Sequence, residues 1–261
     1  MTSSQESQST AESSFESNPD EAPRTVFVHG SGRAGKDAWP HQASWDNSIF
    51  LTRPGYGPDE IPIETDFDTE SRKVNESARH GANVIAHSFG AVAVIIAASH
   101  PDTAIKSMVL IEPAAFSLSR GTPAVEAHIA AVGPVFENAS NMTPADFMVA
   151  FLKSLGVPNV EVPTSDDDLT QARRNQLLRP PWEAQLDSSI FSRIPTLVLS
   201  GRWNAEYEEV ADALEAAGAR HEYIEGYGHR IQDSPDFEAL VHDFWSSLDS
   251  ESGNYNGLSR A

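Results

Sequence analysis

The chain has no cysteine among its 261 residues. It can therefore form neither a disulfide nor a thiolate metal site, and any covalent catalysis has to use serine, threonine, lysine or a carboxylate. The sequence also lacks an apolar run long enough to cross a bilayer. These absences predict a protein without membrane spans whose chemistry does not depend on thiols.

Basic residues are scarce, because 18 lysines and arginines stand against 38 aspartates and glutamates, for a formal net charge of −20 at pH 7. Nucleic acids and anionic membranes are bound largely through lysine and arginine side chains that neutralise phosphate. The charge argues against both as partners and favours a small neutral molecule as the ligand. No oligomeric state follows from the sequence.

Residues 1–23 contain five acidic residues, no basic residue and almost no apolar side chain. A segment with so little to bury predicts a disordered tail, and we expect a second, flexible tail at 249–261. The opening segment also lacks the basic and apolar regions of a secretory signal. We therefore expect a cytoplasmic protein.

Between these tails, short β-rich runs alternate with helical patterns. The helix-like stretch EEVADALEAAGA has apolar residues at helical spacing, whereas the strand-like runs are apolar almost throughout. These runs are TVFVHG, SIFLTRPGYG, NVIAHSFG, SMVLIEP, TLVLSG and HEYIEGYGH. The alternation predicts an α/β fold with a mostly parallel sheet, helices on both faces and functional loops at the carboxyl ends of strands.

Residues 117–193 interrupt this alternation with helix-like stretches such as PAVEAHIAAV and TPADFMVAFLKSL and no clear strand. We interpret them as a helical lid inserted between two parts of the core, 24–116 and 194–248. A lid of this kind would cover the site and select the substrate. Ordinary crossover helices are the alternative interpretation.

The segment NVIAHSFGAVAVIIAA has the pattern of a nucleophile elbow. A strand runs into Ser88 and a helix leaves at once, with Ala86 and Gly90 two residues to either side. The turn is so sharp that only small residues fit at these two positions, although the usual first residue is glycine. The pattern predicts Ser88 as the nucleophile and the backbone N–H of Phe89, at the helix N-terminus, as one oxyanion donor.

Two further loops carry matching parts. In VFVHGSGRAG, Gly30 lets backbone approach a bound substrate, and the N–H of Ser31 can supply the second oxyanion donor. A phosphate-binding loop is the rival interpretation, but RAGK lacks the full motif. Among nine histidines, His229 alone follows the last strand in a glycine-flanked loop, EGYGH, which predicts it as the general base.

Taken in order, VFVHGSG, FLTRPGYG, NVIAHSFG, VLIEP, TLVLSGRW and EGYGH make residues 24–245 resemble the α/β-hydrolase family. The resemblance implies serine hydrolysis through an acyl-enzyme, with no cofactor. It begins at the strand before the oxyanion loop, so we expect the first antiparallel strands of the family to be missing and the core to be compact.

The resemblance leaves the acid of the catalytic triad open. Its commonest position in the family holds Asn204 here, and asparagine cannot balance the charge of an imidazolium. A minority of the family, including dehalogenases and certain lactone hydrolases, has the acid one strand earlier, where this chain has Glu112. We predict Glu112 as the acid. Glu206 and Glu209 are alternatives, although both stand where a helix begins and acidic residues are favoured.

The predicted substrate is a neutral ester or lactone, because the chain is acidic and the lid contributes apolar residues. Trp182, which follows two prolines, is predicted to reach the site and bind substrate together with Gly30. We expect no metal, since there is no His-Glu-x-x-His motif and the SDDD run favours a solvated loop or helix cap. Two alternatives stay open: a binding protein that lacks a competent triad acid, and a carbon–carbon hydrolase or lyase that uses the same serine and histidine.

Overall fold

The structure is a computed structural model that describes residues 24–258, with side chains described to residue 250. The predicted tail at 1–23 lies outside the described residues, as do residues 259–261. Helix α7, Phe237–Leu258, runs past the predicted end of the core at 248. The part of the second predicted tail that the structure describes is therefore helical.

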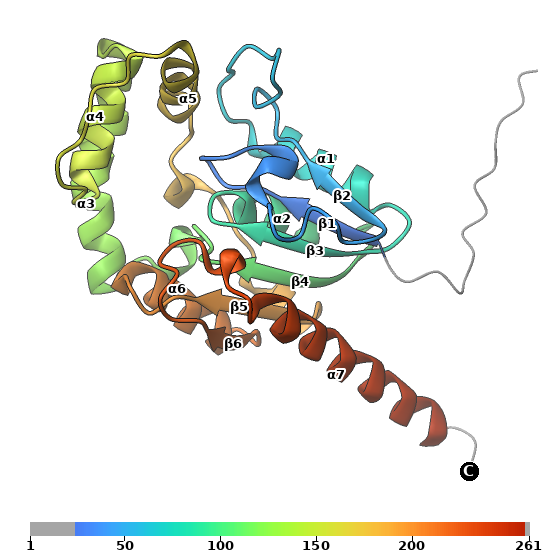
Figure 1. Cartoon of the computed structure of the whole chain (residues 1–261). Coiled ribbons are helices and arrows are strands. Elements are labelled where there is room, and N and C mark those ends of the chain that lie inside the picture. Colours follow the sequence, from blue (N-terminus) through green and yellow to red (C-terminus); the bar gives the residue numbers. More distant parts are fainter. Residues whose placement is uncertain (1–23, 259–261) are drawn as a thin grey trace, which may run out of the picture.

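The core is a six-stranded sheet in the order β2-β1-β3-β4-β5-β6, and every neighbouring pair is parallel (Figure 1). The strands are β1 Arg24–Val28, β2 Ser48–Leu51, β3 Ala82–His87, β4 Ile105–Ile111, β5 Thr196–Ser200 and β6 Arg220–Tyr223. This confirms the predicted α/β class. The register pairs His87 with Ile111, so Ser88 and Glu112 follow side by side at the carboxyl ends of two central strands.

One face of the sheet packs against three helices. Val26, Val84 and Met108 point to this face and form one buried cluster with residues of α1 Phe67–Ala78, α2 Gly90–Ser99 and α6 Ala205–Ala216. Helix α2 is apolar on all sides, and such a helix has to be buried. The nucleophile elbow thus opens into the most buried helix of this face.

The opposite face is covered mainly by α7 and by a short 3₁₀ turn, η1 Gly35–Ala38, that leads to Trp39. Phe27, Ile85 and Val109 alternate along their strands with the residues of the first cluster and pack here. Because side chains alternate between the faces of a strand, continuous apolar strands supply both clusters.

The segment between β4 and β5 consists of helices and turns, without a strand among its residues (Figure 1). Its three α-helices each begin at a serine or threonine cap, and two of them have proline in the first turn, which favours helix initiation. They are α3 Pro123–Glu137, α4 Pro144–Ser154 and α5 Asp166–Gln176; the 3₁₀ turns are η2 Phe116–Ser119, η3 Ala139–Asn141, η4 Pro181–Glu183 and η5 Ser188–Ser192.

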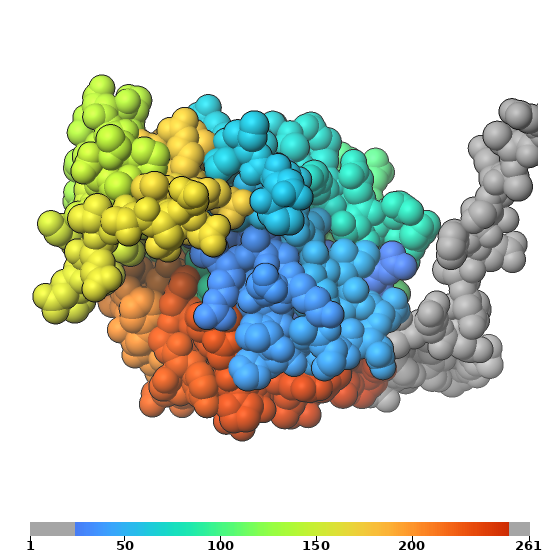
Figure 2. All heavy atoms as spheres, turned by 45° about the horizontal axis from the view of Figure 1, so that its top comes forward, coloured from blue at the N-terminus to red at the C-terminus, as the bar shows by residue number. Residues whose placement is uncertain are grey.

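Helix α5 holds this segment against two loops of the core. Gln171 donates a hydrogen bond to the carbonyl of Ser31, and Arg174 donates to the carbonyls of Gly55 and Gly57. In Figure 2, the yellow part of residues 117–193 lies beside the cyan loop that follows β2. The action of residues 117–193 as a lid stays a prediction. No helix within residues 24–258 combines the length and apolar character needed to cross a membrane.

Candidate active site

Ser88 stands in a strained turn between β3 and α2. Its φ of 54° lies in the left-handed region that non-glycine residues rarely adopt, and its N–H donates to the carbonyl of Ile111 at 2.8 Å. A Cβ added to Gly90 would come within 2.5 Å of the carbonyl oxygen of His29, so this position requires glycine. The turn directs Ser88 out of the sheet at its carboxyl edge.

His229 lies between Ser88 and Glu112. Its Nε2 is 2.9 Å from Ser88 Oγ, and its Nδ1 is 3.3 Å from Glu112 Oε2. An ionised carboxylate only accepts hydrogen bonds, so Nδ1–H donates to Glu112, and the neutral ring accepts the Ser88 hydroxyl proton at Nε2. The structure thus brings together the three side chains predicted to form the triad.

Glu112 is fully buried at the end of β4, with a φ of 44°. Its Oε1 accepts the N–H of Gly201 at 2.6 Å, and its Oε2 accepts the indole N–H of Trp203 at 2.9 Å. A buried carboxylate is costly unless it is hydrogen-bonded or paired. Both of these donors come from the loop after β5, where the family resemblance placed the usual acid.

The other candidate acids have different partners. The Asn204 side chain caps α6 by accepting the N–H of Glu206. The Glu206 carboxylate pairs with His128 Nδ1 at 3.0 Å, and the Glu209 carboxylate accepts the first N–H groups of α3, from Ala124 and Val125. None of these three side chains has a recorded hydrogen bond to His229 in the described part of the chain.

The two predicted oxyanion donors flank Ser88. A Cβ on Gly30 would lie 3.1 Å from Ser88 Cβ, so the loop that carries Ser31 closely approaches the nucleophile. Phe89 precedes the first turn of α2. Within residues 24–258, no recorded backbone hydrogen bond is donated by the N–H of Ser31 or Phe89. Their action as donors to a bound carbonyl oxygen stays a prediction.

The model of the α/β hydrolase family matches residues 25–241. This span covers most of the chain. The chain belongs to the α/β-hydrolase family. No curated protein sequence matches it.

Solved structures resemble this α/β hydrolase at low sequence identity. MenH from S. aureus is 16% identical with a TM-score of 0.64, covering 89% of this chain and 97% of its own. Carboxylesterase CesB (YbfK) from Bacillus subtilis is 16% identical with a TM-score of 0.55, covering 88% and 85%. Est816, described as an N-acyl homoserine lactone degrading enzyme, is 20% identical with a TM-score of 0.53, covering 86% and 93%. These likenesses show the fold.

A buried ion pair supports the oxyanion loop of this hydrolase. Arg53 donates to both carboxylate oxygens of Glu70, at 2.9 and 3.0 Å, and to the carbonyl of Gly30 at 3.1 Å. His29 Nε2 accepts the N–H of Arg53, so its Nδ1–H donates to the same carbonyl. Burial, and then the charge of Arg53, lower the pKa of His29 to about 3. The loop therefore rests on a neutral imidazole and a fixed guanidinium.

His87, the residue before Ser88, supports the loop that carries His229. Its Nε2–H donates to the carbonyl of His229 at 2.7 Å, and the two rings lie 4.7 Å apart. Burial, followed by the proximity of His229, holds the pKa of His87 well below its ordinary value. His87 therefore stays neutral and keeps its donor at physiological pH.

Trp182 lies within the helical segment. Its indole packs edge-on against Phe136 and His128, at 5.8 and 6.0 Å between ring centroids. It also lines a cavity of about 650 Å³ with Leu178 and Arg179. Neither Ser88 nor His229 lines this cavity. Binding of substrate by Trp182 stays a prediction.

Sequence reasoning missed several residues around the site: Arg53, Glu70, His87, Trp203 and Tyr207. Glu70 had a signal, because it shares a helical face with the buried residues Phe67 and Val74, where a carboxylate needs a buried partner. Arg53 directly follows an apolar strand, which is a weaker signal. The roles of the other three depend on how loops place side chains, and no local pattern encodes that.

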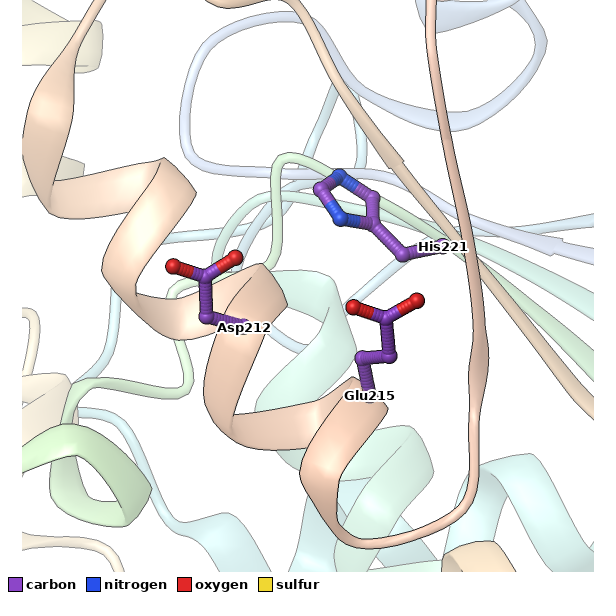
Figure 3. Close-up of side chains that lie close together, drawn as sticks. All are labelled: Asp212, Glu215 and His221. Carbon is purple, nitrogen blue, oxygen red and sulfur yellow. The ribbon is translucent and has the colours of Figure 1, made fainter.

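Asp212 and Glu215 of α6 and His221 of β6 form a group outside the site that could hold a metal ion, with ligand atoms within 4.8 Å of one another (Figure 3). Both carboxylates are exposed. His221 Nε2 is 2.8 Å from Ser200 Oγ. Exposed carboxylates gather readily on a chain with a net charge of −20, and we assign no metal to this group.

Proposed function

We propose that this α/β hydrolase cleaves a neutral carboxylic ester or lactone through an acyl-enzyme on Ser88. The observation that carries the proposal is the position of His229, whose Nε2 is 2.9 Å from Ser88 Oγ while its Nδ1 faces the Glu112 carboxylate. A serine hydroxyl is a weak nucleophile unless an adjacent base takes its proton, and this geometry supplies the base and the group that orients it.

The mechanism follows from the residues. His229 takes the Ser88 proton as Oγ attacks the acyl carbon, and the N–H groups of Ser31 and Phe89 bind the oxygen that becomes negative. Glu112 keeps the imidazole oriented and balances its positive charge. His229 then gives the proton to the departing oxygen, and water attacks the acyl-enzyme by the same steps in reverse. No step needs a cofactor.

Three considerations support this substrate class. A haloalkane or epoxide would alkylate Ser88 to an ether that water cannot cleave, so the nucleophile favours acyl transfer over reactions that use a carboxylate nucleophile on this fold. The net charge of −20 disfavours acidic substrates. Two of the structural neighbours, a carboxylesterase and a lactone-degrading enzyme, act on the same class. We further propose that the protein acts in the cytoplasm on a small molecule, without nucleic acid or membrane.

The test is covalent labelling by a fluorophosphonate, followed by intact mass, because it needs no knowledge of the substrate. We expect rapid single labelling of the native chain, none in Ser88→Ala, sharply slower labelling in Glu112→Gln and native labelling in Asn204→Ala. A folded native chain that resists labelling would contradict the proposal and favour a binding protein on a hydrolase fold.

A further inference from the structure

Tyr207 stands beside the nucleophile and has no part in the mechanism above. It comes from the first turn of α6, and its half-buried ring packs against the rings of His229 at 4.9 Å, Phe116 at 5.7 Å and Trp203 at 6.0 Å. The Ser88 side chain is among the groups that influence the pKa of the Tyr207 hydroxyl. A polar side chain beside the hydrogen-bonded pair of Ser88 and His229 is positioned to contact a substrate.

The hydroxyl of Tyr207 is a permanent donor. Burial raises its pKa well above the ordinary value of a tyrosine, and the nearby carboxylates of Glu112 and Glu206 raise it further. The side chain therefore keeps its proton at neutral pH and can donate one hydrogen bond.

The sheet order places this donor on the side of Ser88 away from the oxyanion loop. Gly30 and Ser31 follow β1, whereas Tyr207 follows β5, and β3 with Ser88 lies between β1 and β5 in the order β1-β3-β4-β5. In the mechanism above, the carbonyl oxygen of a substrate accepts hydrogen bonds from the N–H of Ser31, on the β1 side, and from the N–H of Phe89. Tyr207 approaches from the side of His229, where the departing oxygen has to lie to receive its proton.

We propose that Tyr207 contacts the substrate and donates its hydroxyl to the leaving-group oxygen of the ester or lactone, which rests on the function proposed above. When the tetrahedral intermediate collapses, the bond between the acyl carbon and this oxygen breaks and its electron pair stays on the oxygen. The proton comes from His229 Nε2. Tyr207 keeps its own proton and stabilises the charge that develops before that transfer is complete.

The experiment compares leaving groups in the variant Tyr207→Phe, which keeps the ring against His229 and removes only the hydroxyl. For ethyl esters and lactones, whose alkoxides leave poorly, we expect kcat/KM to fall about 10- to 100-fold. For p-nitrophenyl esters of the same acyl group the fall should stay below about threefold, because nitrophenolate needs little stabilisation. The acid limb of the pH profile of kcat/KM should keep its midpoint.

The matched control is Tyr223→Phe on β6, at a tyrosine that is 45% exposed and covered on one face by Arg202. The Tyr223→Phe variant should hydrolyse every ester of the series with the native kcat/KM. Circular dichroism melting of both variants checks that the fold persists. A role of Tyr207 in positioning His229 alone would reduce hydrolysis of all esters equally, move the pH midpoint and slow fluorophosphonate labelling.

The outcomes separate the two proposals. An equal loss for all leaving groups, or no loss, would overturn the role of Tyr207 while native labelling of Ser88 and native hydrolysis leave the proposed function intact. If the native chain neither is labelled nor hydrolyses any ester of the series, the proposed function fails and this inference fails with it.

Discussion

The loops after β4 and β5 leave the same edge of the sheet from neighbouring strands, yet the first supplies a carboxylate and the second supplies hydrogen-bond donors to it. The β4 loop begins with Glu112, a fully buried carboxylate. The β5 loop offers no carboxylate to His229 and instead points two hydrogen-bond donors at Glu112, from Gly201 and Trp203. A carboxylate can thus be buried after β4 because the neighbouring loop supplies the donors that make its burial tolerable.

The acidic residues that remain on the β5 side serve the helical segment. Glu209 caps α3 and Glu206 pairs with His128 of the same helix. These contacts join α6, which follows β5, to the segment that leaves β4. The Glu112 carboxylate therefore faces His229, whereas the carboxylates of Glu206 and Glu209 connect α6 to α3.

The substitution Glu112→Gln removes the charge from the β4 side of the site, and we expect kcat to fall about 10⁴-fold. The amide has nearly the volume of the acid, but its NH₂ would donate to His229 Nδ1. The ring would then carry its proton on Nε2 and could not accept one from Ser88. Steady-state ester hydrolysis and the rate of fluorophosphonate labelling measure the loss.

The control for this substitution is Glu209→Gln, which removes a carboxylate from α6, the helix that follows β5. It should lower the melting temperature through α3 and leave kcat within about threefold of native. The double variant Glu112→Gln with Asn204→Asp should stay as slow as Glu112→Gln, because the residue at 204 faces the start of α6. Recovery in the double variant would show that the β5 loop can still hold the acid.

A second prediction extends the comparison to β1 and β3, whose ends hold neutral imidazoles. The ordinary histidine pKa is about 6.5, and that of buried His29 is lowered to about 3. Between these values the unfolded chain binds a proton that the folded chain does not, so stability rises with pH in this window and is lost as pH falls below about 6.5. Each such histidine contributes about 1.4 kcal/mol per pH unit to the slope.

His87 should contribute in the same direction, because its pKa is also lowered. The variant His87→Gln keeps a donor for the carbonyl of His229 but does not titrate. Urea unfolding between pH 5 and 6.5 should therefore show a slope lower by about 1.4 kcal/mol per pH unit than that of the native chain. The same substitution at His100, whose side chain is exposed, is the matched control. Equal slopes in native and His87→Gln chains would contradict a neutral His87.

A third prediction concerns the donors of the β5 loop. Trp203→Phe removes the indole N–H that Glu112 Oε2 accepts and keeps an aromatic ring near His229. Loss of one hydrogen bond to a charged group predicts a fall in kcat/KM of about 10-fold. The matched control is Trp245→Phe, which removes an indole donor to Ser107 on β4 and should cost stability without loss of kcat/KM. The reverse pattern would show that Trp203 does not hold the acid.

Part of this site could be predicted from the sequence because its signals are local. The elbow requires small residues on both sides of Ser88, so its pattern appears within a few positions. His229 follows a strand in a short glycine-flanked loop, and Glu112 ends an apolar strand. The structure brings these three side chains together, while their catalytic roles stay predictions.

The rest of the site depends on distant contacts. Arg53, in the loop after β2, forms an ion pair with Glu70 of α1, and no local pattern encodes which residue each of them contacts. Trp203 is identifiable as a donor only once Glu112 is known to lie beneath it. The proline pair before Trp182 led to the prediction that its side chain binds substrate; its indole packs against aromatic residues of the helical segment, and its contact with substrate stays a prediction. Proline restricts backbone direction and does not specify which cavity a side chain lines.

The smallest expected effect comes from Asn204, at the position that holds the acid in most of the family. Its side chain caps α6, so Asn204→Ala should cost about 1 kcal/mol of unfolding free energy. Asn204→Asp should cost little, since aspartate also caps and is favoured at a helix N-terminus. Neither should change kcat, because Glu112 already occupies Nδ1 of His229. Urea unfolding and ester hydrolysis on the same two variants decide the matter: a kinetic effect of Asn204→Ala without a loss of stability would place Asn204 in the site rather than in the helix.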